Sequence, residues 1–399
     1  MLDIVTATTL YPNAQQPRHG IFVERRLLQL RGTGAIRARV VAPVPWFPWQ
    51  GKRFGRYGVY AEIPASEVRH GVSVDHPRYP VVPKIGMHVA PALMAAALLP
   101  YFRRLQASAT RAFLLDAHFL YPDGVALALI ARLLKIPVVL TARGSDVNTF
   151  CRYPGPRAMV RWAARHCAKV ITVSDALRQK LAAIGVPHDA IAVMRNGVDE
   201  QLFTPIDRSA ARATVRYEGF TVLSVGNLVP LKGHDLVIEA VARIPDARLV
   251  VIGEGPGATP LRRLIAARGL EQRVSMLGNV SQAELVQHYN AADALVLASS
   301  SEGMPNVVLE SLACGTPVIG TAVGGIPELI TSPDAGLIVP DRNAAAIARA
   351  IQALRSAYPD RSRTRRHALK FSWKTTVDGL LDIFDDTLSG YEQPARARG

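Results

Sequence analysis

Short apolar runs alternate with amphipathic stretches along the chain. In the first 200 residues the apolar runs predict buried strands at Ile4–Thr6, Ala38–Ala42, Phe113–Ala117, Val138–Thr141 and Val170–Val173. The stretches between several of them predict helices over residues 20–31, 122–134, 157–167 and 175–184. Because strands and helices follow one another in turn, this pattern predicts a parallel sheet with helices on both faces.

The second half repeats the pattern. Its predicted strands are Val222–Val225, Arg248–Ile252, Val274–Leu277, 294–298 and Val318–Gly320. Its predicted helices are 234–243, 260–268, 282–291, 305–314 and 325–330. Two such halves predict an α/β protein with two Rossmann-like doubly wound domains, over residues 1–200 and 205–370.

A single barrel is the alternative architecture. The strand and turn over Val193–Asp199, followed by a linker at Phe203–Pro205, argue against it. Beyond the second domain, Trp373–Leu388 has the spacing of an amphipathic helix. Residues 393–399 are expected to be disordered.

The composition limits the compartment and the partners. Three cysteines without metal or disulfide spacing favour a reducing compartment. We expect no secretory leader and no transmembrane helix, because the N-terminus reads as a strand and no run of about 18 apolar residues exists. Residues 1–200 carry 26 Lys and Arg against 12 Asp and Glu, whereas residues 201–399 are nearly balanced. This asymmetry indicates an anionic partner for the first half, or simply a basic solvated face.

The polar stretch Ser301–Glu310 lies between the predicted strand 294–298 and the predicted helix 305–314. Strand–loop–helix units of this kind bind phosphates and nucleotides, because the N–H groups that open a helix lack intrahelical partners. Glu302 in the loop can accept from sugar hydroxyls, and Glu310, about two turns along the helix, can reach a ribose diol. On spacing alone, one carboxylate that complements the helix dipole and one solvated glutamate are an equally good interpretation.

A second loop of this type follows the strand Val222–Val225. Gly226 provides the turn, and Lys232 can reach a diphosphate as a point charge. The P-loop pattern is absent, and taken alone a solvated lysine is as good an interpretation.

The motifs occur together and in a fixed order. Residues 222–330 contain V-G-N-L-V-P-L-K-G-H, V-I-G-E-G-P, L-G-N-V, S-E-G-M-P-N-V-V-L-E-S-L-A-C-G-T-P-V-I and G-G-I-P-E-L-I. The first half adds Tyr11-Pro12, Gly20–Val23, Ala117–Phe119, Arg143–Asp146, Val173-Ser174 and Asn196–Asp199. As a set, over nearly the whole chain, they resemble glycosyltransferase family 4. These are retaining enzymes of the GT-B fold, here of the bacterial surface-polysaccharide type.

The resemblance implies two Rossmann-like domains that face each other across a cleft. The acceptor would bind mainly on the first domain and the nucleotide sugar mainly on the second, with helix 373–388 packed back on the first. It implies Glu302 on the hydroxyls of the transferred sugar, His118 near that sugar and Glu310 on the ribose. The implied catalytic residues are Glu302, His118 and Lys232. The implied donor-binding residues are Gly20, Asn227, Lys232, Gly303, Met304, Pro305, Asn306, Val307 and Glu310.

The chain departs from the family pattern at several positions. Asn227 stands where relatives often have Arg, so one cationic phosphate contact is missing, and Arg143 or Arg195 could supply it. Arg143 itself stands where many relatives have His, and His19 precedes Gly20 where two adjacent glycines are common. A lone histidine such as His118 at a strand end is often simply packed. Asp146 either contacts substrate or orients its loop through backbone hydrogen bonds.

The chain contains no D-x-D motif, so we expect no divalent metal and no cofactor. Lys232, helix termini and backbone amides would then neutralise the diphosphate. We expect a front-face displacement in which the leaving diphosphate accepts the proton of the acceptor hydroxyl. A double displacement would need a carboxylate at the anomeric carbon, and Glu302 is the evident candidate.

Two segments of the first half suggest a membrane surface. Pro43–Tyr57 interleaves aromatic and basic residues, and the apolar run Val89–Phe102 is flanked by Lys84 and Arg103-Arg104. Both suit the headgroup region of an anionic bilayer, while a rigid loop and a core helix are the alternatives. With the charge asymmetry, they predict a protein in the cytoplasm, peripheral at the inner face of the cytoplasmic membrane, with a lipid-linked or growing glycan acceptor.

Other functions remain open from the sequence. A GT-B sugar-nucleotide epimerase would need further acid/base pairs beside the sugar. A catalytically silent protein that binds nucleotide sugars or anionic polymers is disfavoured by the presence of Glu302, Glu310 and Lys232. Nucleic acid is not expected as a partner, because only charge supports it and no recognised motif is present.

Overall fold

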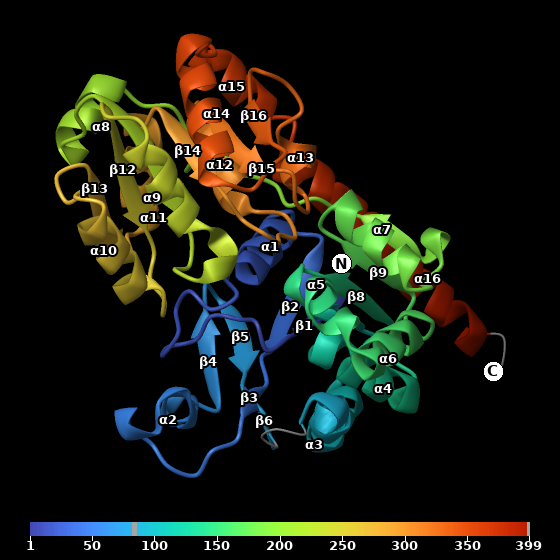
Figure 1. Ribbon diagram of the computed structural model, residues 1–399. Helices are drawn as coiled ribbons and strands as arrows, with labels where there is room; N and C mark the ends of the chain where they lie inside the picture. The colour runs from blue at the N-terminus through green and yellow to red at the C-terminus, as the bar shows by residue number, and fades with distance from the viewer. Residues whose placement is uncertain (82–85, 397–399) are drawn as a thin grey trace. The chain divides into compact units, whose positions relative to one another are not determined.

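The computed structural model describes residues 1–81 and 86–396. The chain forms two compact units, Met1–Met194 with Thr376–Gly399, and Arg195–Thr375. Each unit is a mainly parallel sheet with helices packed against it (Figure 1). The predicted fold class, α/β with two Rossmann-like doubly wound domains, is therefore confirmed.

Within residues 1–81 and 86–194, eight strands form one sheet in the order β10-β9-β8-β7-β1-β2-β5-β4. Its pairs are parallel except for β4 with β5, and β3 with β6 forms a separate short ladder. The strands are β1 (Leu2–Ala7), β2 (Ile36–Val41), β3 (Val44–Pro45), β4 (Ser66–Arg69), β5 (Val72–Asp75), β6 (Arg78–Tyr79), β7 (Leu114–His118), β8 (Val138–Ala142), β9 (Lys169–Thr172) and β10 (Ile191–Val193). The helices are α1 (Ile21–Gly32), α2 (Arg56–Glu62), α3 (Gly86–Ser108), α4 (Val125–Leu134), α5 (Ser145–Asn148), α6 (Pro154–Ala164), α7 (Asp175–Ala183) and the greater part of α16 (Trp373–Arg396).

Within residues 195–375, six parallel strands follow the order β13-β12-β11-β14-β15-β16. The strands are β11 (Phe220–Val225), β12 (Ala247–Ile252), β13 (Val274–Gly278), β14 (Ala294–Leu297), β15 (Val318–Thr321) and β16 (Gly336–Val339). The helices are α8 (Arg208–Val215), α9 (His234–Ala242), α10 (Ala258–Ala267), α11 (Gln282–Ala291), α12 (Asn306–Ala313), α13 (Ile326–Leu329), α14 (Ala344–Ser356) and α15 (Arg361–Ala368).

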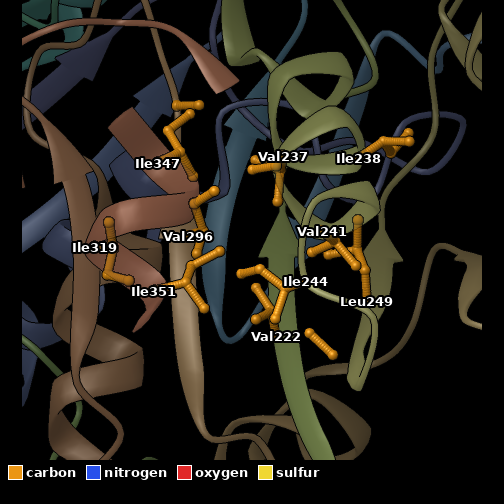
Figure 2. Packing of buried hydrophobic residues seen from close by; sticks show 14 of the residues in the cluster. Val222, Val237, Ile238, Val241, Ile244, Leu249, Val296, Ile319, Ile347 and Ile351 are labelled. Atoms are coloured by element: carbon orange, nitrogen blue, oxygen red, sulfur yellow. The ribbon is translucent and has the colours of Figure 1, made fainter. Parts of the chain in front are cut away.

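Aliphatic side chains fill the space between sheet and helices in the second unit. Val222 of β11 and Val296 of β14 are buried together with Val237 of α9 and Ile351 of α14 (Figure 2). Removing such branched side chains from water is the main stabilising term, and their packing fixes the strand ends that carry the candidate site.

The C-terminal helix α16 belongs to the core of the first unit. Val377, Leu380, Phe384 and Leu388 are buried in one cluster with residues of β1, α1 and β2. The helix extends to Arg396, so the prediction of disorder is wrong for residues 393–396, and residues 397–399 lie outside the described part of the chain.

The apolar run Val89–Phe102 lies within α3, where Met94, Leu98 and Phe102 are buried. Its apolar face therefore packs inside the first unit, as the core-helix alternative predicts. Lys84, expected to flank this run, lies outside the described residues. Within residues 1–81 and 86–396, no helix combines the length and the hydropathy needed to span a bilayer.

Candidate functional site

The sequence-predicted residues gather where the strand order of each sheet reverses. In the second unit β11 lies between β12 and β14, and in the first unit β1 lies between β2 and β7. At such a switch point the loops of adjacent strands leave toward opposite faces of the sheet and open a crevice at the carboxyl ends. Gly226–Lys232 follows β11 and the Glu302 loop follows β14; the Gly20 loop follows β1, and His118 ends β7.

In the second unit, the loops after β11 and β14 interlock. A Cβ at Gly233, which has φ of +68°, would lie 2.2 Å from the carbonyl oxygen of Ala298, so this close approach requires glycine. The backbone N–H of Ser300 donates to the carbonyl of Leu231 at 2.9 Å. Lys232 is thereby held beside the loop after β14.

Glu302 lies at the centre of these contacts. Its Oε1 accepts from Nζ of Lys232 at 2.6 Å and from Oγ of Ser299 at 2.7 Å. Their side chains are 10% exposed for Glu302 and 19% for Lys232, so the ion pair is largely shielded from water. This pair joins the two residues for which the sequence predicts catalytic roles.

The loop after β15 supports Glu302 from the other side. A Cβ at Gly324, with φ of +55°, would lie 2.2 Å from the carbonyl oxygen of Glu302. The N–H of Gly325 donates to the carbonyl of Gly303 at 2.9 Å. The glycine pair of the G-G-I-P-E-L-I motif therefore supports the Glu302 backbone.

The amino end of α12 directly follows the loop that carries Glu302. Pro305 is the N-cap residue and makes no side-chain cap bond, so the first N–H groups of the helix are oriented toward the loop side. Gly303, Met304 and Pro305 are buried, and Asn306 and Val307 are partly exposed. The positive end of the helix dipole lies at the loop that carries Glu302.

Residues 195 and 196 contact this loop within the second unit. The N–H of Asn196 lies 3.2 Å from Sδ of Met304, and its side-chain amide donates to Oδ1 of Asn306 at 2.9 Å. Arg195 pairs with Glu328 of α13 at 2.7 Å. Arg195 is thus engaged by a carboxylate, while the side chain of Asn227 is exposed in its turn.

Glu310 is 6% exposed, on the second turn of α12. Its Oε2 accepts from the hydroxyl of Tyr289 in α11 at 3.0 Å. Tyr289 is fully buried, so this bond fixes the orientation of the carboxylate. Tyr289 and Ser299 were not predicted as site residues, because a buried tyrosine has no sequence signal that would distinguish it from a core residue.

In the first unit, the β1–α1 loop carries Gly20. Gly20 is the N-cap of α1 with φ of +66°, and a Cβ there would lie 2.2 Å from the carbonyl oxygen of Leu10. The ring of His19 lies 3.0 Å from the carbonyl of Thr9 through Nε2, and burial lowers the pKa of His19. The loop is thus folded back closely on itself.

His118 is buried in a chain of polar contacts. Its Nε2 lies 3.0 Å from Oδ2 of Asp116, and its Nδ1 lies 2.6 Å from Nη2 of Arg143. Because a guanidinium only donates, Nδ1 must be the acceptor, and the ring proton lies on Nε2 and is donated to Asp116. Arg26 donates to the other oxygen of Asp116 at 3.0 Å.

Burial and the neighbouring charges determine the protonation state of His118. Burial lowers the pKa of His118 to about 3, with Arg143 and Arg26 acting in the same direction and Asp116 against it. The pKa of Asp116 is held low by Arg26 and His118 although burial opposes this. Burial and the cations of Arg143 and Arg26 therefore favour the neutral form of His118, in agreement with Nδ1 as the acceptor of the Arg143 bond.

Asp146 joins the segment after β7 to the segment after β8. Its carboxylate accepts from the N–H groups of Leu120 at 2.8 Å, Gly144 at 2.7 Å and Arg143 at 3.1 Å. The side chain is fully buried, and burial raises its pKa against these donors. The structure thus shows the loop-orienting contacts that the sequence left as one of two alternatives.

Asp123 was not identified from the sequence. One of its oxygens, Oδ2, accepts from the N–H of Thr9 at 2.6 Å, the hydroxyl of Thr9 at 2.8 Å and the hydroxyl of Thr8 at 3.3 Å. Its Oδ1 is buried without a hydrogen-bond partner among the described residues. Burial raises its pKa to about 7. Asp123 therefore joins the loop after β7 to the loop that carries Gly20.

Among the described residues, no group of three or more His, Cys, Asp or Glu side chains is arranged to hold a metal ion. In the second unit Lys232 supplies a cation beside Glu302, and in the first unit Arg143 supplies a cation beside His118.

Two family models match the chain. Residues 35–202 match "Glycosyltransferase Family 4", and residues 207–371 match "Glycosyl transferases group 1". The D-inositol 3-phosphate glycosyltransferase of Mycobacteroides abscessus is 34% identical over 236 residues, covering 57% of this chain and 53% of the relative. That of Mycobacterium tuberculosis is 35% identical over 243 residues, covering 58% and 51%. The chain thus spans about half the length of these curated relatives.

Solved structures match over nearly the full length. Sucrose-phosphate synthase from Thermosynechococcus elongatus has a TM-score of 0.78 at 19% identity, covering 98% of this chain and 100% of that chain. The Anabaena protein HepE in complex with UDP-glucose has a TM-score of 0.70 at 19% identity, covering 98% and 100%. At these identities the likeness establishes the fold, and the predicted GT-B fold is confirmed.

Proposed function

The chain belongs to the family 4 glycosyltransferases of the GT-B fold, and on this premise we propose that it transfers a sugar from a nucleotide-diphosphate sugar to a glycan-type acceptor with retention of configuration. The observation that carries the proposal is the Lys232–Glu302 pair at 2.6 Å, beside the amino end of α12. A cation for phosphate and a carboxylate for sugar hydroxyls adjoin a helix terminus suited to anions.

The donor is proposed to lie along α12. Glu302 accepts from hydroxyls of the transferred sugar, Lys232 holds the distal phosphate, and Glu310 accepts from the ribose. The N–H groups at the start of α12 complete the diphosphate site. The bond from Tyr289 to Oε2 of Glu310 supports this arrangement, because it fixes the orientation of the carboxylate.

We propose a front-face displacement without a covalent enzyme intermediate. The bond from the anomeric carbon to the diphosphate breaks while the oxygen of the acceptor hydroxyl bonds to that carbon from the same face. The proton of the acceptor hydroxyl passes to the leaving diphosphate. Glu302 is a poor nucleophile because its Oε1 accepts from a lysine and a serine. His118, neutral and bonded through both ring nitrogens, positions groups rather than transferring a proton. An epimerase is not favoured, since it would need a mobile acid/base pair at the sugar.

Charge on the departing diphosphate is proposed to be neutralised by Lys232 and backbone amides, without a divalent metal. The D-x-D motif that commonly accompanies a metal-held diphosphate is absent from the sequence. Transfer that persists in excess chelator, and that stops in Lys232→Ala, would support this part of the proposal.

We further propose that the protein acts in bacterial surface-polysaccharide assembly, in the cytoplasm at the inner face of the cytoplasmic membrane, on a lipid-linked or growing glycan. An aromatic cluster supports the membrane contact: Phe47 packs against Trp49, Phe54 and Tyr57. Trp46 and Trp49 are each 58% exposed. The guanidinium of Arg53 lies 4.7 Å from the ring centroid of Phe54, and exposed tryptophans in a cluster that also holds a cation suit an anionic headgroup layer. The free thiols of Cys151, Cys167 and Cys314 agree with a reducing compartment.

Two experiments test these proposals. A thermal-shift screen of UDP-, GDP- and ADP-sugars identifies the donor, because a ligand that binds the folded state raises its stability by mass action. If no nucleotide sugar shifts the melting temperature, the donor site is wrong. Flotation with anionic vesicles tests the membrane contact, with Trp46→Ala/Trp49→Ala as the variant. Failure of the wild type to bind at low salt would refute membrane association.

A further inference from the structure

Arg342 connects the two loops that carry Lys232 and Glu302. Its Nε donates to the carbonyl oxygen of Ala298 at 2.8 Å, and its Nη2 donates to that of Pro230 at 3.3 Å. Ala298 follows β14 and opens the loop that leads to Glu302, and Pro230 opens the short 3-10 turn that ends at Lys232. One guanidinium from a third loop, between β16 and α14, therefore bridges both loops.

The carbonyl of Ala298 lies where β14 has separated from β11. The paired residues of these strands end at Leu223 with Leu295, three positions before Ala298. Ala298 is 1% exposed, and a buried carbonyl beyond the end of a ladder needs a donor from elsewhere. Arg342 supplies that donor. Both of its acceptors are backbone oxygens, so the bridge fixes main-chain positions of the two loops.

The backbone of Arg342 is anchored by α14. The next residue, Asn343, is the N-cap of this helix, and its side chain accepts from the N–H of Ala346 at 2.8 Å. Further along the helix, Ile347 and Ile351 are buried in one cluster with Val296 of β14 (Figure 2). The guanidinium thus extends from a helix that packs on the same strand whose loop it holds.

The Lys232–Glu302 pair, at 2.6 Å, depends on how these two loops are placed. The backbone bond from Ser300 to Leu231, at 2.9 Å, joins the loops at one point. Arg342 joins them at a second point. One attachment acts as a pivot, whereas two attachments fix the orientation of one loop against the other. Loss of the guanidinium should therefore leave the loops connected but allow Lys232 to adopt more positions.

We propose that Arg342 is a positioning residue of the donor site, which holds the loops after β11 and β14 so that Lys232 is pre-oriented for a nucleoside diphosphate. The inference rests on the proposed function, in which Lys232 holds the distal phosphate. Every residue in it belongs to the second unit. Pre-orientation reduces the cost of ordering a side chain on binding, so losing it weakens the contribution of Lys232 to affinity.

A double-mutant cycle on the full chain tests the inference. Calorimetry first compares UDP, GDP and ADP, and the cycle uses the one that the wild type binds most tightly. Arg342→Ala should raise its dissociation constant about fivefold. Lys232→Met should raise it about thirtyfold alone, as expected for a charge-assisted bond, but less than about tenfold when Arg342→Ala is already present. A residue that only stabilises the fold would leave the effect of Lys232→Met unchanged.

Arg349→Ala is the charge-matched control, because Arg349 is exposed on α14. The effect of Lys232→Met in its presence should equal that in the wild type. Arg342→Lys keeps the charge without the planar fork and should lie between wild type and Arg342→Ala. It also provides the same cycle if the alanine variant does not fold, and denaturant unfolding of every variant checks this.

An effect of Lys232→Met that is equal with and without Arg342 overturns the inference. A dissociation constant in Arg342→Ala equal to that in Arg349→Ala does so too. If the wild type binds none of the three nucleoside diphosphates, the proposed function fails as well. If it binds one of them and the cycle is additive, only this inference fails.

Discussion

The ammonium of Lys232 lies 2.6 Å from Oε1 of Glu302, and Ser299 donates to the same oxygen at 2.7 Å. The two charges come from loops after adjacent strands, β11 and β14. Each is proposed to bind a different part of the donor. A diphosphate that draws Lys232 away would therefore change the environment of the carboxylate that binds the sugar, and the pair couples phosphate binding to sugar orientation.

Glu302→Gln should separate the orientation of the sugar from the binding of the phosphates. The amide keeps the shape of the side chain but loses the charge that orders sugar hydroxyls and Lys232. We expect kcat to fall about 100-fold, a loss of about 2.7 kcal/mol in transition-state stabilisation, while the dissociation constant for UDP changes only a few-fold. Nucleotide-release kinetics and calorimetry measure the two quantities. Glu218→Gln, at an exposed pair with Arg248, is the matched control. Unchanged transfer in Glu302→Ala would rule out the proposed site.

Tyr289→Phe removes one hydroxyl behind Glu310. The loss of a single hydrogen bond of about 1 kcal/mol should raise KM for the nucleotide sugar about fivefold, with little change in kcat, because Glu310 is proposed to bind the ribose and not the reacting carbon. A matching rise in the dissociation constant of UDP should accompany it. A fall in kcat with KM unchanged would show that Glu310 acts elsewhere.

Much of the fold follows from local pattern. Strands such as Val138–Ala142 are continuous apolar runs, and helices such as Asp175–Ala183 carry their own caps, so each is recognisable in isolation. The strands β4, β5 and β16 were not predicted. β4 alternates exposed and partly exposed positions and β5 alternates buried and partly exposed positions, over four residues each, which is too short for a reliable period.

The site was predictable where glycines and charges lie in loops beside strand ends, as for Gly226, Lys232 and Glu302. The supporting residues were not. Neither Asp116, in a strand, nor Asp123, after that strand, has a local sequence signal. Asp116 bonds to Arg26, 90 positions away, and Asp123 bonds to Thr9, 114 positions away. Whether a lone His118 is packed or functional depends on such distant contacts, so sequence alone left both readings open.

Arg365→Ala should destabilise the second unit without altering its chemistry. The guanidinium donates to the carbonyls of Phe203 and Ala313 at 2.6 Å each and to that of Glu200 at 3.1 Å. Leaving these acceptors unpaired should lower the free energy of unfolding by about 2–3 kcal/mol. Denaturant unfolding measures the loss. The exposed neighbour Arg366→Ala should change stability by less than about 0.5 kcal/mol. Equal effects of both variants would contradict the contact-based explanation.

Asp123 should make the folded protein less stable as pH rises. Its pKa is raised to about 7 by burial, against about 3.9 in an unfolded chain. Between these values the folded state binds more protons than the unfolded state. The contribution of Asp123 to the free energy of unfolding is therefore fully present below about pH 4 and is lost as pH rises through about 7. The free energy of unfolding falls over this range by at most about 1.4 kcal/mol per pH unit.

Asp123→Asn removes this titration and retains a carbonyl oxygen for the Thr8 and Thr9 donors. The difference in unfolding free energy between wild type and variant should shift in favour of the variant as pH rises from 5 to 8. Chemical denaturation at several pH values measures this difference, and subtraction cancels the titration of all other groups. Asp146 and Tyr79 interact electrostatically with Asp123, so Tyr79→Phe is the control, and it should leave the direction of the slope unchanged. A difference independent of pH would mean that Asp123 is ionised throughout, and that its three donors outweigh its burial.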